Sequence, residues 1–373
     1  CIPDEKIDGI ELYKTALLTR LEDIEEVIGG VVSEYSLKYK KSNKFLIDSS
    51  GGASTSWLKD LLKTLNINAL EVSTRDNPIN QSCGAGDFSP TSSWIWEEII
   101  GEQKHFLLRK VGEIIQSNNG IPPWSVGEII GAALDGDGDR CLLFEVTDYG
   151  LKIINGDQIT DEILRAAHTT CPNNQWKIAC TIEADMGLVE SVKRFSPEYE
   201  ILETAVGDRW LSNSLRTNLK MNKFLEGENQ PTCIGCEDSG HIVLPIRHPN
   251  QKNHWSLVGD GIMTLLSVLS ARVVINNNEK NTLSKYNKGW KKRVSVKDAD
   301  RNKWNGKNDL ANIVINTTKE SLDCENNLEI ENIYGENNLL LMKVKLNKDL
   351  ISIGIRNSGP EAKTSISIRA NPN

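Results

Sequence analysis

The sequence predicts an α/β protein in which two similar, mixed-sheet α/β domains are followed by a C-terminal α+β domain. Two observations carry this prediction: a strand–loop–helix–strand unit occurs twice, and short β-like runs replace it toward the C-terminus. The 373 residues suffice for several domains. A hydrophobic fraction of 39% provides enough apolar material for their cores and excludes a disordered chain.

The N-terminal segment predicts one amphipathic helix. In residues 10–28 apolar side chains recur every three or four positions, and Gly29-Gly30 follows as a stop signal. The polar, lysine-rich residues 38–44 indicate a linker. We therefore expect residues 1–43 to form a linking helix ahead of the first α/β domain.

The first copy of the repeated unit lies in residues 44–155, which we expect to form one α/β domain. A strand at 45–47 leads into a glycine-bearing loop, and a helix over 57–65 precedes a second strand at 69–72. The continuous apolar run at 129–134 indicates a further, buried strand.

The second copy lies in residues 156–282, the next expected α/β domain. A strand at 177–181 is followed by a glycine-bearing loop, a helix at 188–195 and a strand at 199–202. Because the order of elements repeats, we expect the two domains to share their topology.

The remaining residues, 283–373, predict a separate α+β domain. Asparagine and lysine become common there, and a helix is expected over 308–321. Short β-like runs predict strands over 339–345, 351–355 and 364–368.

Composition disfavours two classes of partner. Forty-three Lys and Arg against fifty-one Asp and Glu give a net charge of −8, which disfavours binding to nucleic acid. The longest apolar stretch, 261–275, is too short and too polar to span a bilayer. With eight irregularly spaced cysteines and no visible signal peptide, we expect a cytoplasmic protein with reduced thiols and no nucleic-acid or membrane partner. The oligomeric state cannot be predicted from this sequence.

The most specific motif is Asp-Gly-Asp-Gly-Asp-Arg at residues 135–140, directly after the predicted buried strand. An EF-hand calcium loop is excluded, because the positions that require glycine and an acid in that loop hold Arg140 and Val146. The remaining alternative to a metal site is an acidic surface turn, since Asp-Gly pairs are common in turns.

We favour a magnesium site formed by Asp135, Asp137 and Asp139. Three carboxylates at alternating positions can converge on one hard cation, and the intervening glycines permit a tight bend. Arg140 either offsets the repulsion of the three acids or faces a phosphoryl group that shares the metal.

Three further motifs carry side chains suited to a sugar phosphate. Residues 204–210 end a predicted strand and open a helix. Residues 235–241 offer carboxylate and hydroxyl groups of the kind that bind sugar hydroxyls. Residues 356–363 combine arginine, serine, glycine and lysine, as in a phosphate-binding loop. A polar turn explains each of these motifs equally well when it is taken alone.

Taken in order, the four motifs resemble those of the α-D-phosphohexomutase family, which includes phosphomannomutase, phosphoglucomutase and phosphoglucosamine mutase. Residues 135–140 match the family's metal loop, 206–210 resemble its domain-three loop and 237–241 resemble its sugar-binding loop. Residues 356–359 resemble the start of its C-terminal phosphate-binding loop. The resemblance extends over roughly residues 44 to 373.

The resemblance implies roles for individual residues. Asp135, Asp137 and Asp139 would bind Mg²⁺, and Arg140 would be catalytic. The substrate-binding residues would be Gly207, Asp208, Arg209, Glu237, Ser239 and His241. The phosphate-binding residues would be Arg356, Asn357, Ser358, Gly359 and Lys363.

The resemblance also implies a reaction, in which phosphate moves between the 6- and 1-positions of a hexose phosphate through a phosphoserine and a hexose 1,6-bisphosphate. Magnesium would polarise the phosphoserine. We expect a phosphomannomutase or phosphoglucomutase of carbohydrate metabolism, with a hexose phosphate as substrate and the bisphosphate as activator. The alternatives are phosphoglucosamine mutase and a non-catalytic relative that binds sugar phosphates.

Two departures from the family pattern are visible. The family's catalytic serine lies in a Ser-His-Asn sequence of domain one, and no Ser-His dipeptide occurs in this chain. We therefore expect these 373 residues to comprise domains two to four and to be inactive alone. In the last loop Pro360 and Ala362 replace the family's Thr and Pro, and Pro360 offers neither a hydroxyl nor a backbone N–H to a phosphate.

Overall fold

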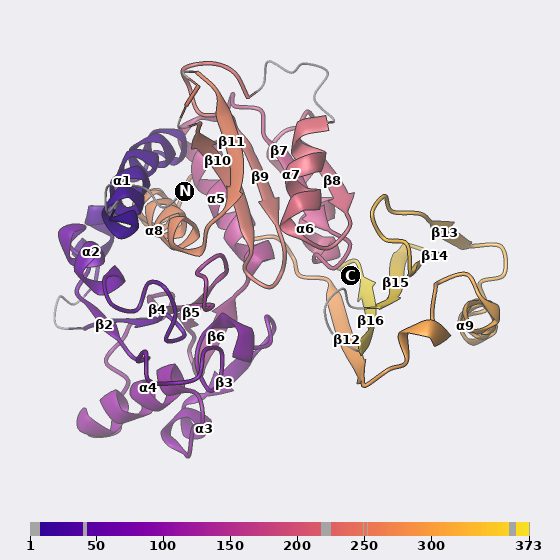
Figure 1. The fold of residues 1–373 in the computed structure, drawn as a ribbon, viewed down its shortest axis with the longest axis horizontal. Helices are drawn as coiled ribbons and strands as arrows, with labels where there is room; N and C mark the ends of the chain where they lie inside the picture. Colours follow the sequence, from indigo (N-terminus) through magenta and orange to yellow (C-terminus); the bar gives the residue numbers. More distant parts are fainter. Residues whose placement is uncertain are drawn as a thin grey trace, which may run out of the picture. The chain divides into compact units, whose positions relative to one another are not determined.

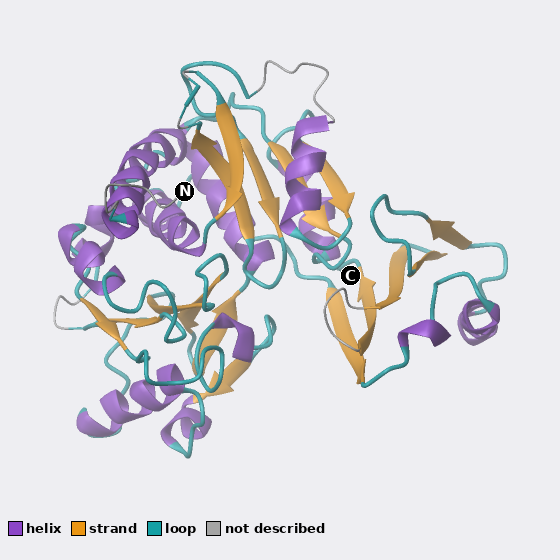
Figure 2. Cartoon of the chain, in the orientation of Figure 1, coloured by secondary structure: helices purple, strands orange, loops and turns teal. Residues whose placement is uncertain are grey.

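The strands that the structure describes form three sheets, and the predicted fold class is confirmed (Figures 1 and 2). The computed structural model describes residues 8–39, 43–217, 225–248, 250–251, 253–357 and 363–372, with only the backbone of Arg301. The chain divides into two compact units. The first comprises Cys1–Trp176, Leu219–Ile234 and Asp238–Ser284, and the second comprises Lys177–Asn218, Gly235–Glu237 and Lys285–Asn373.

The first sheet has six strands and mixed pairing. Its order is β2 (Ala69–Glu71), β1 (Phe45–Asp48), β4 (Ile129–Leu134), β5 (Cys141–Val146), β6 (Gly150–Ile154) and β3 (Ser93–Ile95). Strand β1 runs parallel to β2 and β4, and the remaining pairs are antiparallel. Three helices belong to this region: α2 (Leu58–Thr64), α3 (Trp96–Ile100) and α4 (Phe106–Ser117), with a short 3-10 turn, η2 (Ala85–Asp87). Apolar side chains of α4 pack on the sheet, so the β4 strand lies in a well-filled core.

A helical layer completes the first unit. It contains α1 (Gly9–Ile28), the 3-10 turn η1 (Val32–Leu37), α5 (Gly156–Thr170) and α8 (Gly261–Asn277). Helix α8 packs against α5 and α1, and its residues from Gly261 to Val274 are all buried. The stretch whose apolar character was noted in the sequence is therefore a central helix. Among the described helices, none combines the length and apolarity needed to cross a membrane.

The second sheet repeats part of this topology. Its order is β11 (Trp255–Gly259), β10 (Ile242–Arg247), β9 (Cys233–Cys236), β7 (Lys177–Thr181) and β8 (Glu200–Thr204). Strand β7 is parallel to β8 and is joined to it through α6 (Met186–Ser191) and η3 (Val192–Arg194), as β1 is joined to β2 through α2. The predicted repeat of the strand–helix–strand unit is confirmed. Helix α7 (Asp208–Thr217) begins three residues earlier than the predicted start at residue 211.

The third sheet is antiparallel throughout. Its order is β12 (Trp290–Lys297), β16 (Lys363–Ala370), β15 (Asp349–Asn357), β14 (Leu339–Leu346) and β13 (Leu328–Glu331). One face of this sheet forms an apolar core with α9 (Asp309–Leu322), whose N-terminus is capped by Asn308, while η4 (Arg301–Lys303) follows β12. The helix and the three strands predicted in this region are confirmed, and β12 and β13 are additional.

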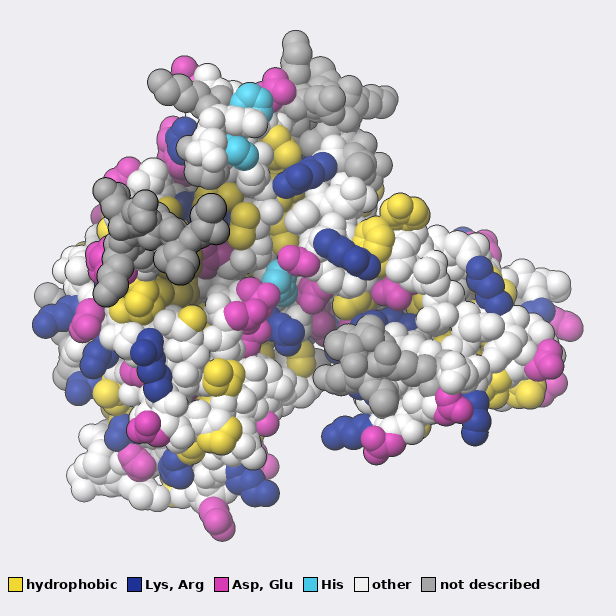
Figure 3. Space-filling view, in the orientation of Figure 1, with side chains coloured by type: hydrophobic (Ala, Val, Ile, Leu, Met, Phe, Trp, Pro, Cys, Tyr) yellow, Lys and Arg dark blue, Asp and Glu magenta, His cyan; other side chains and the backbone are white. Residues whose placement is uncertain are grey.

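The three expected domain ranges can be compared with these sheets. The strands β1–β6 fall within 44–155, β7–β11 within 156–282 and β12–β16 within 283–373. The two compact units do not follow these three ranges, because each unit combines three separate segments of the chain. The predicted domain boundaries therefore stay a prediction. On the face drawn in Figure 3, acidic and basic side chains of the described residues are interspersed.

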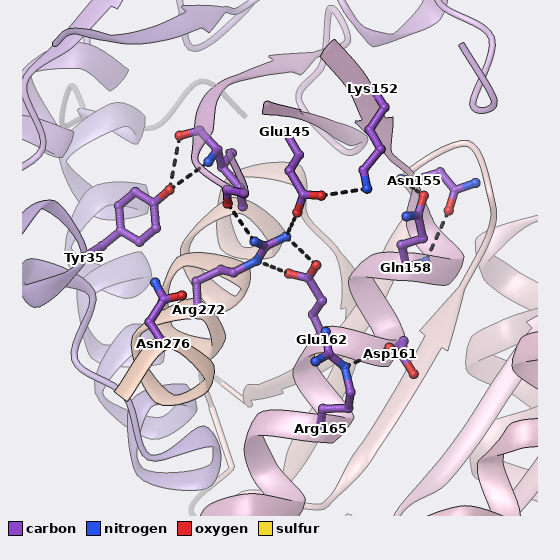
Figure 4. A network of polar contacts seen from close by, with 12 residues as sticks. Tyr35, Glu145, Lys152, Asn155, Gln158, Asp161, Glu162, Arg165, Arg272 and Asn276 are labelled. Atoms are coloured by element: carbon purple, nitrogen blue, oxygen red, sulfur yellow. Dashed lines mark hydrogen bonds and ion pairs between the residues drawn. The ribbon is translucent and has the colours of Figure 1, made fainter. Parts of the chain in front are cut away.

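One buried arginine joins the helical layer to the six-stranded sheet (Figure 4). Arg272 of α8 donates to both carboxylate oxygens of Glu162 on α5, to Glu145 on β5 and to the carbonyl oxygen of Gly127. Burial alone would lower the pKa of Arg272, but the charges of Glu162 and Glu145 outweigh it and hold that pKa above its ordinary value. The Lys152 ammonium lies 2.7 Å from the second oxygen of Glu145.

Replacing Arg272 with Met should strongly destabilise the first unit. Two buried glutamates would lose their main counter-charge, and breaking a buried pair in this way costs about 3–5 kcal/mol. Urea denaturation followed by far-UV circular dichroism measures the loss. Lys152→Met is the matched control, because that side chain is one-third exposed and its pair should contribute less than about 1 kcal/mol. Equal losses for the two variants would contradict the central role of Arg272.

Candidate functional site

The acidic loop after β4 brings its three aspartates together. One carboxylate oxygen from each of Asp135, Asp137 and Asp139 lies within 4.8 Å of the others. Asp135 is buried, Asp139 is half-buried and Asp137 is exposed, so the cluster opens to solvent on one side. This arrangement suits a hard cation that takes oxygen ligands and keeps some of its waters.

The hydrogen bonding of Asp139 supports a cation at this position. Its Oδ1 atom is buried and accepts no hydrogen bond from the part of the chain that the structure describes. Its Oδ2 atom lies 3.4 Å from Nδ1 of His241, and the Nε atom of Arg140 lies 3.9 Å from Oδ1. A buried carboxylate oxygen without a donor is costly unless something binds it, and Mg²⁺ fits that need.

The pKa values of two of these aspartates move in opposite directions. Burial raises the pKa of Asp135 to about 6, against the hydrogen bond that it accepts from the backbone N–H of Arg140, and neighbouring Asp139 adds to the rise. The hydrogen bond from His241 lowers the pKa of Asp139 in spite of burial. A divalent cation would favour the ionised form of both carboxylates.

Glycines allow the acidic loop to lie close to its surroundings. Gly138 has φ +83°, and its carbonyl oxygen accepts from the N–H of Gly261 at 2.9 Å. A Cβ atom at Gly261 would lie 2.4 Å from the carbonyl oxygen of Arg140, and one at Gly259 would lie 2.1 Å from Nε2 of His241. The start of α8 and the end of β11 can approach the loop only because neither position carries a side chain.

Asp260 fixes the start of α8 beside the acidic loop. Its carboxylate caps the helix by accepting from the N–H of Met263 at 2.9 Å, and it is held by Nη1 of Arg20 at 2.9 Å and by the hydroxyl of Tyr13 at 3.0 Å. None of the motifs singled out in the sequence includes this residue. An aspartate directly before an apolar helical run is an N-cap signal that could have indicated it.

His241, predicted as a substrate-binding residue, contacts the predicted metal loop. It is buried beside Asp139 and forms an isolated antiparallel bridge with Arg140. Ser239 is half-buried in the turn between β9 and β10. The Nε atom of Arg140 lies 3.3 Å from Oδ2 of Asp135, and 45% of the Arg140 side chain is exposed. Its guanidinium can therefore reach a ligand in solvent.

In the second unit, two of the predicted substrate motifs meet. The N–H of Gly207, which has φ +123°, donates to Oε1 of Glu237 at 2.6 Å. A carboxylate at the N-terminal end of α7 is stabilised by the helix dipole. Asp208 and Arg209 occupy the first turn of that helix and are exposed, and the Arg209 guanidinium lies 4.6 Å from the ring centre of Trp210.

The predicted phosphate loop is described only at its two ends. Arg356 and Asn357 end β15 and Lys363 begins β16, whereas Ser358 and Gly359, together with Pro360 and Ala362, lie outside the described residues. The Asn357 side chain donates to the carbonyl oxygen of Trp304 at 2.9 Å and accepts from the hydroxyl of Thr364 at 2.8 Å, so it joins the ends of the strands.

Arg356 already has an anionic partner. Its Nε atom donates to Oε1 of Glu183 at 3.4 Å, and Arg293 of β12 binds the other oxygen of the same carboxylate. Neither Glu183 nor Arg293 was predicted as a site residue. No local sequence pattern marks them, because the contact joins a loop after β7 to strands much later in the chain.

Comparison with known proteins finds similar sequences among the phosphohexomutases. The family model described as "Phosphoglucomutase/phosphomannomutase, alpha/beta/alpha domain III" matches residues 155–292. The chain is 28% identical over 258 residues to the phosphoglucosamine mutase of Hamiltonella defensa, covering 68% of this chain and 44% of that protein. It is 26% identical over 284 residues to that of Pasteurella multocida, covering 73% and 50%.

Solved structures show the same fold. An N-acetylglucosamine-phosphate mutase, described as a member of the α-D-phosphohexomutase superfamily, superposes with a TM-score of 0.56 at 15% identity, over 96% of this chain and 62% of that one. The N-acetylphosphoglucosamine mutase of Aspergillus fumigatus, in complex with GlcNAc-6P and magnesium, gives 0.54 at 16% identity, over 94% and 61%. These similarities support the predicted resemblance to the α-D-phosphohexomutase family. The chain spans between a quarter and a half of the length of the curated relatives that it matches.

Replacing Asp137 with Asn should abolish magnesium binding to the acidic loop. This change removes the charge of a carboxylate without changing its size, and Mg²⁺ relies on few protein carboxylates. Isothermal titration with MgCl₂ should show one weak site in the parent and none in the variant. Asp148→Asn, in the exposed turn between β5 and β6, is the control and should leave binding unchanged. Equal affinity in the parent and the Asp137 variant would disprove the site.

Proposed function

We propose that this chain forms the metal- and sugar-phosphate-binding part of a phosphohexomutase, which moves phosphate between the 6- and 1-positions of a hexose phosphate. The observation that carries the proposal is the convergence of Asp135, Asp137 and Asp139, with a buried Asp139 oxygen that accepts no hydrogen bond from the described residues. The resemblance to the α-D-phosphohexomutases supplies the reaction class. The phosphoserine that carries the phosphate would come from outside these 373 residues.

Each group of residues has a proposed part in this reaction. Mg²⁺ held by the three aspartates would polarise the phosphoserine and neutralise charge on its phosphoryl oxygens. Arg140, next to the acidic loop and partly exposed, would donate hydrogen bonds to the phosphoryl group in transit. His241 would hold Asp139 ionised through its hydrogen bond, and the sugar loop that contains Glu237 and Ser239 would bind ring hydroxyls.

We propose that the substrate is an amino-sugar phosphate, in preference to a mannose or glucose phosphate. The curated relatives named above are phosphoglucosamine mutases, and the solved neighbours are N-acetylglucosamine-phosphate mutases, one of them in complex with GlcNAc-6P. A complex of the Aspergillus protein with glucose 1,6-bisphosphate supports a hexose bisphosphate as activator. The cytoplasmic location and the absence of nucleic-acid and membrane partners remain part of the proposal.

Arg356→Gln should weaken the binding of glucosamine 6-phosphate by about tenfold or more. A charge-assisted hydrogen bond contributes roughly 1.5–3 kcal/mol, and glutamine keeps the polarity of the side chain without its charge. Isothermal titration with glucosamine 6-phosphate, N-acetylglucosamine 6-phosphate and glucose 6-phosphate measures both the loss and the sugar preference. Arg194→Gln is the control. This arginine stacks on Phe195 in the segment Lys177–Asn218 of the second unit, and its loss should leave the affinity for glucosamine 6-phosphate unchanged. Undiminished binding by the Arg356 variant would remove Arg356 from the site.

The 373-residue chain alone should show no mutase turnover. The reaction needs a nucleophile that carries phosphate between two half-reactions, and no Ser-His dipeptide occurs in the sequence. Ser49 and Ser50, which lie in the loop after β1, are fully buried and engaged in hydrogen bonds with Glu71 and Asn80. Intact-mass spectrometry after incubation with glucose 1,6-bisphosphate and MgCl₂ should therefore show no added phosphoryl group. A stoichiometric phosphoserine would refute this proposal, and peptide mapping would locate it.

A further inference from the structure

The C-terminal sheet has two unlike faces. The strand register places apolar residues on the face that packs against α9. On the other face, alternate positions of four neighbouring strands carry cationic side chains. These cations are Lys291, Arg293, Lys297, Lys343, Lys345, Arg356, Lys363 and Arg369. So many positive charges on one face require anions, because like charges on adjacent strands repel one another.

Glutamates of the second unit supply this counter-charge at separate points. Glu203 lies 3.0 Å from Nζ of Lys343 and 3.2 Å from Nη2 of Arg369. Glu183 pairs instead with Arg293 and Arg356. Glu183 and Glu203 therefore neutralise separate pairs of cations, and Lys343 also lies 2.9 Å from Glu331 of β13.

The two ion clusters differ in how accessible their cations are. The Arg369 side chain is only 2% exposed, and it also donates to the carbonyl oxygen of Ala184 and to the hydroxyl of Ser352. Arg293 is 32% exposed and Arg356 is 17% exposed. The arginine of the Glu203 cluster is therefore a closed structural contact, although Lys343 of that cluster is 19% exposed. Solutes can reach both arginines of the Glu183 cluster.

The contact between Glu183 and Arg356 is also a weak one. It uses only Nε of Arg356, at 3.4 Å, whereas guanidinium and phosphate normally meet through two parallel hydrogen bonds of shorter length. Ser367, the register partner of Arg293 on the same face, is buried, and its hydroxyl has no hydrogen-bond partner among the described residues. The Arg356 guanidinium and the Ser367 hydroxyl could therefore donate further hydrogen bonds to an anion.

We propose that Glu183 occupies the place of the substrate's phosphate, and that a phosphate displaces it from Arg356 with Arg293 as a further phosphate ligand. Without ligand, the carboxylate neutralises both guanidiniums and keeps the cationic face from binding other anions. A phosphate dianion carries more charge and more acceptor oxygens than a carboxylate, so it competes successfully for Arg356. This inference rests on the proposed function of Arg356 as a phosphate ligand.

The proposal and a simple positioning role make opposite predictions for Glu183→Gln. If Glu183 competes with phosphate, the neutral variant binds glucosamine 6-phosphate and inorganic phosphate about tenfold more tightly, the size of change expected from one charge-assisted contact. If Glu183 only orients Arg356, the variant binds them more weakly. Glu203→Gln is the matched control, since it removes a carboxylate from the same sheet face without touching Arg356, and should leave both affinities unchanged.

The experiment is isothermal titration of both ligands into the 373-residue parent, Glu183→Gln, Glu203→Gln and the double variant Glu183→Gln/Arg293→Gln. The gain in Glu183→Gln should disappear in the double variant. Glu183→Asp, which keeps the charge but shortens the side chain, should show a smaller gain and serves if the Gln variant does not fold. Unchanged or weaker binding by the folded variant overturns the inference.

The possible outcomes distinguish failure of the role proposed for Glu183 from failure of the proposed function. If the parent binds the hexose phosphate and Glu183→Gln binds no more tightly, the inference fails and the proposed function stands. If no hexose phosphate binds but Glu183→Gln gains an inorganic-phosphate site that depends on Arg293, the inference stands and the sugar assignment fails. Absence of binding in every variant disproves both.

Discussion

The arrangement of the first unit depends on one buried guanidinium. Arg272 lies between Glu162 of α5 and Glu145 of β5, so it fixes α8 against both a helix and the six-stranded sheet. The same helix starts at Gly261, whose N–H bonds to the acidic loop through Gly138. The position of the three aspartates is thus tied to an ion cluster several turns away along α8.

Local patterns were sufficient to predict much of the fold. Helix α1, strand β4 and helix α9 follow from apolar periodicity and caps within their own residues, and each lies where it was predicted. Strand β12 was not predicted, because its many charged residues, one of which pairs with Glu183 of a distant loop, leave no continuous apolar alternation. Its strand character depends on pairing with β16, which only the folded chain shows.

The candidate site likewise has a part that could be predicted from the sequence and a part that could not. The acidic loop could be predicted, because its three carboxylates and glycines lie within six residues. The contacts that define its environment could not, since His241, Asp260 and Gly261 come from distant segments. In the second unit, the pairing of Glu183 with Arg356 is equally invisible in the sequence. It requires a loop and a strand with no shared local pattern to meet.

The close approach of glycines to the acidic loop has a consequence for inherited variation. A single methyl group at Gly259 would collide with the imidazole of His241, and one at Gly261 would collide with the backbone of Arg140. Alleles that destroy the loop can therefore leave all of its charged residues intact. In a genetic screen such alleles would map to codons 259 and 261, far along the gene from the acidic loop. They would be taken for folding defects unrelated to that loop.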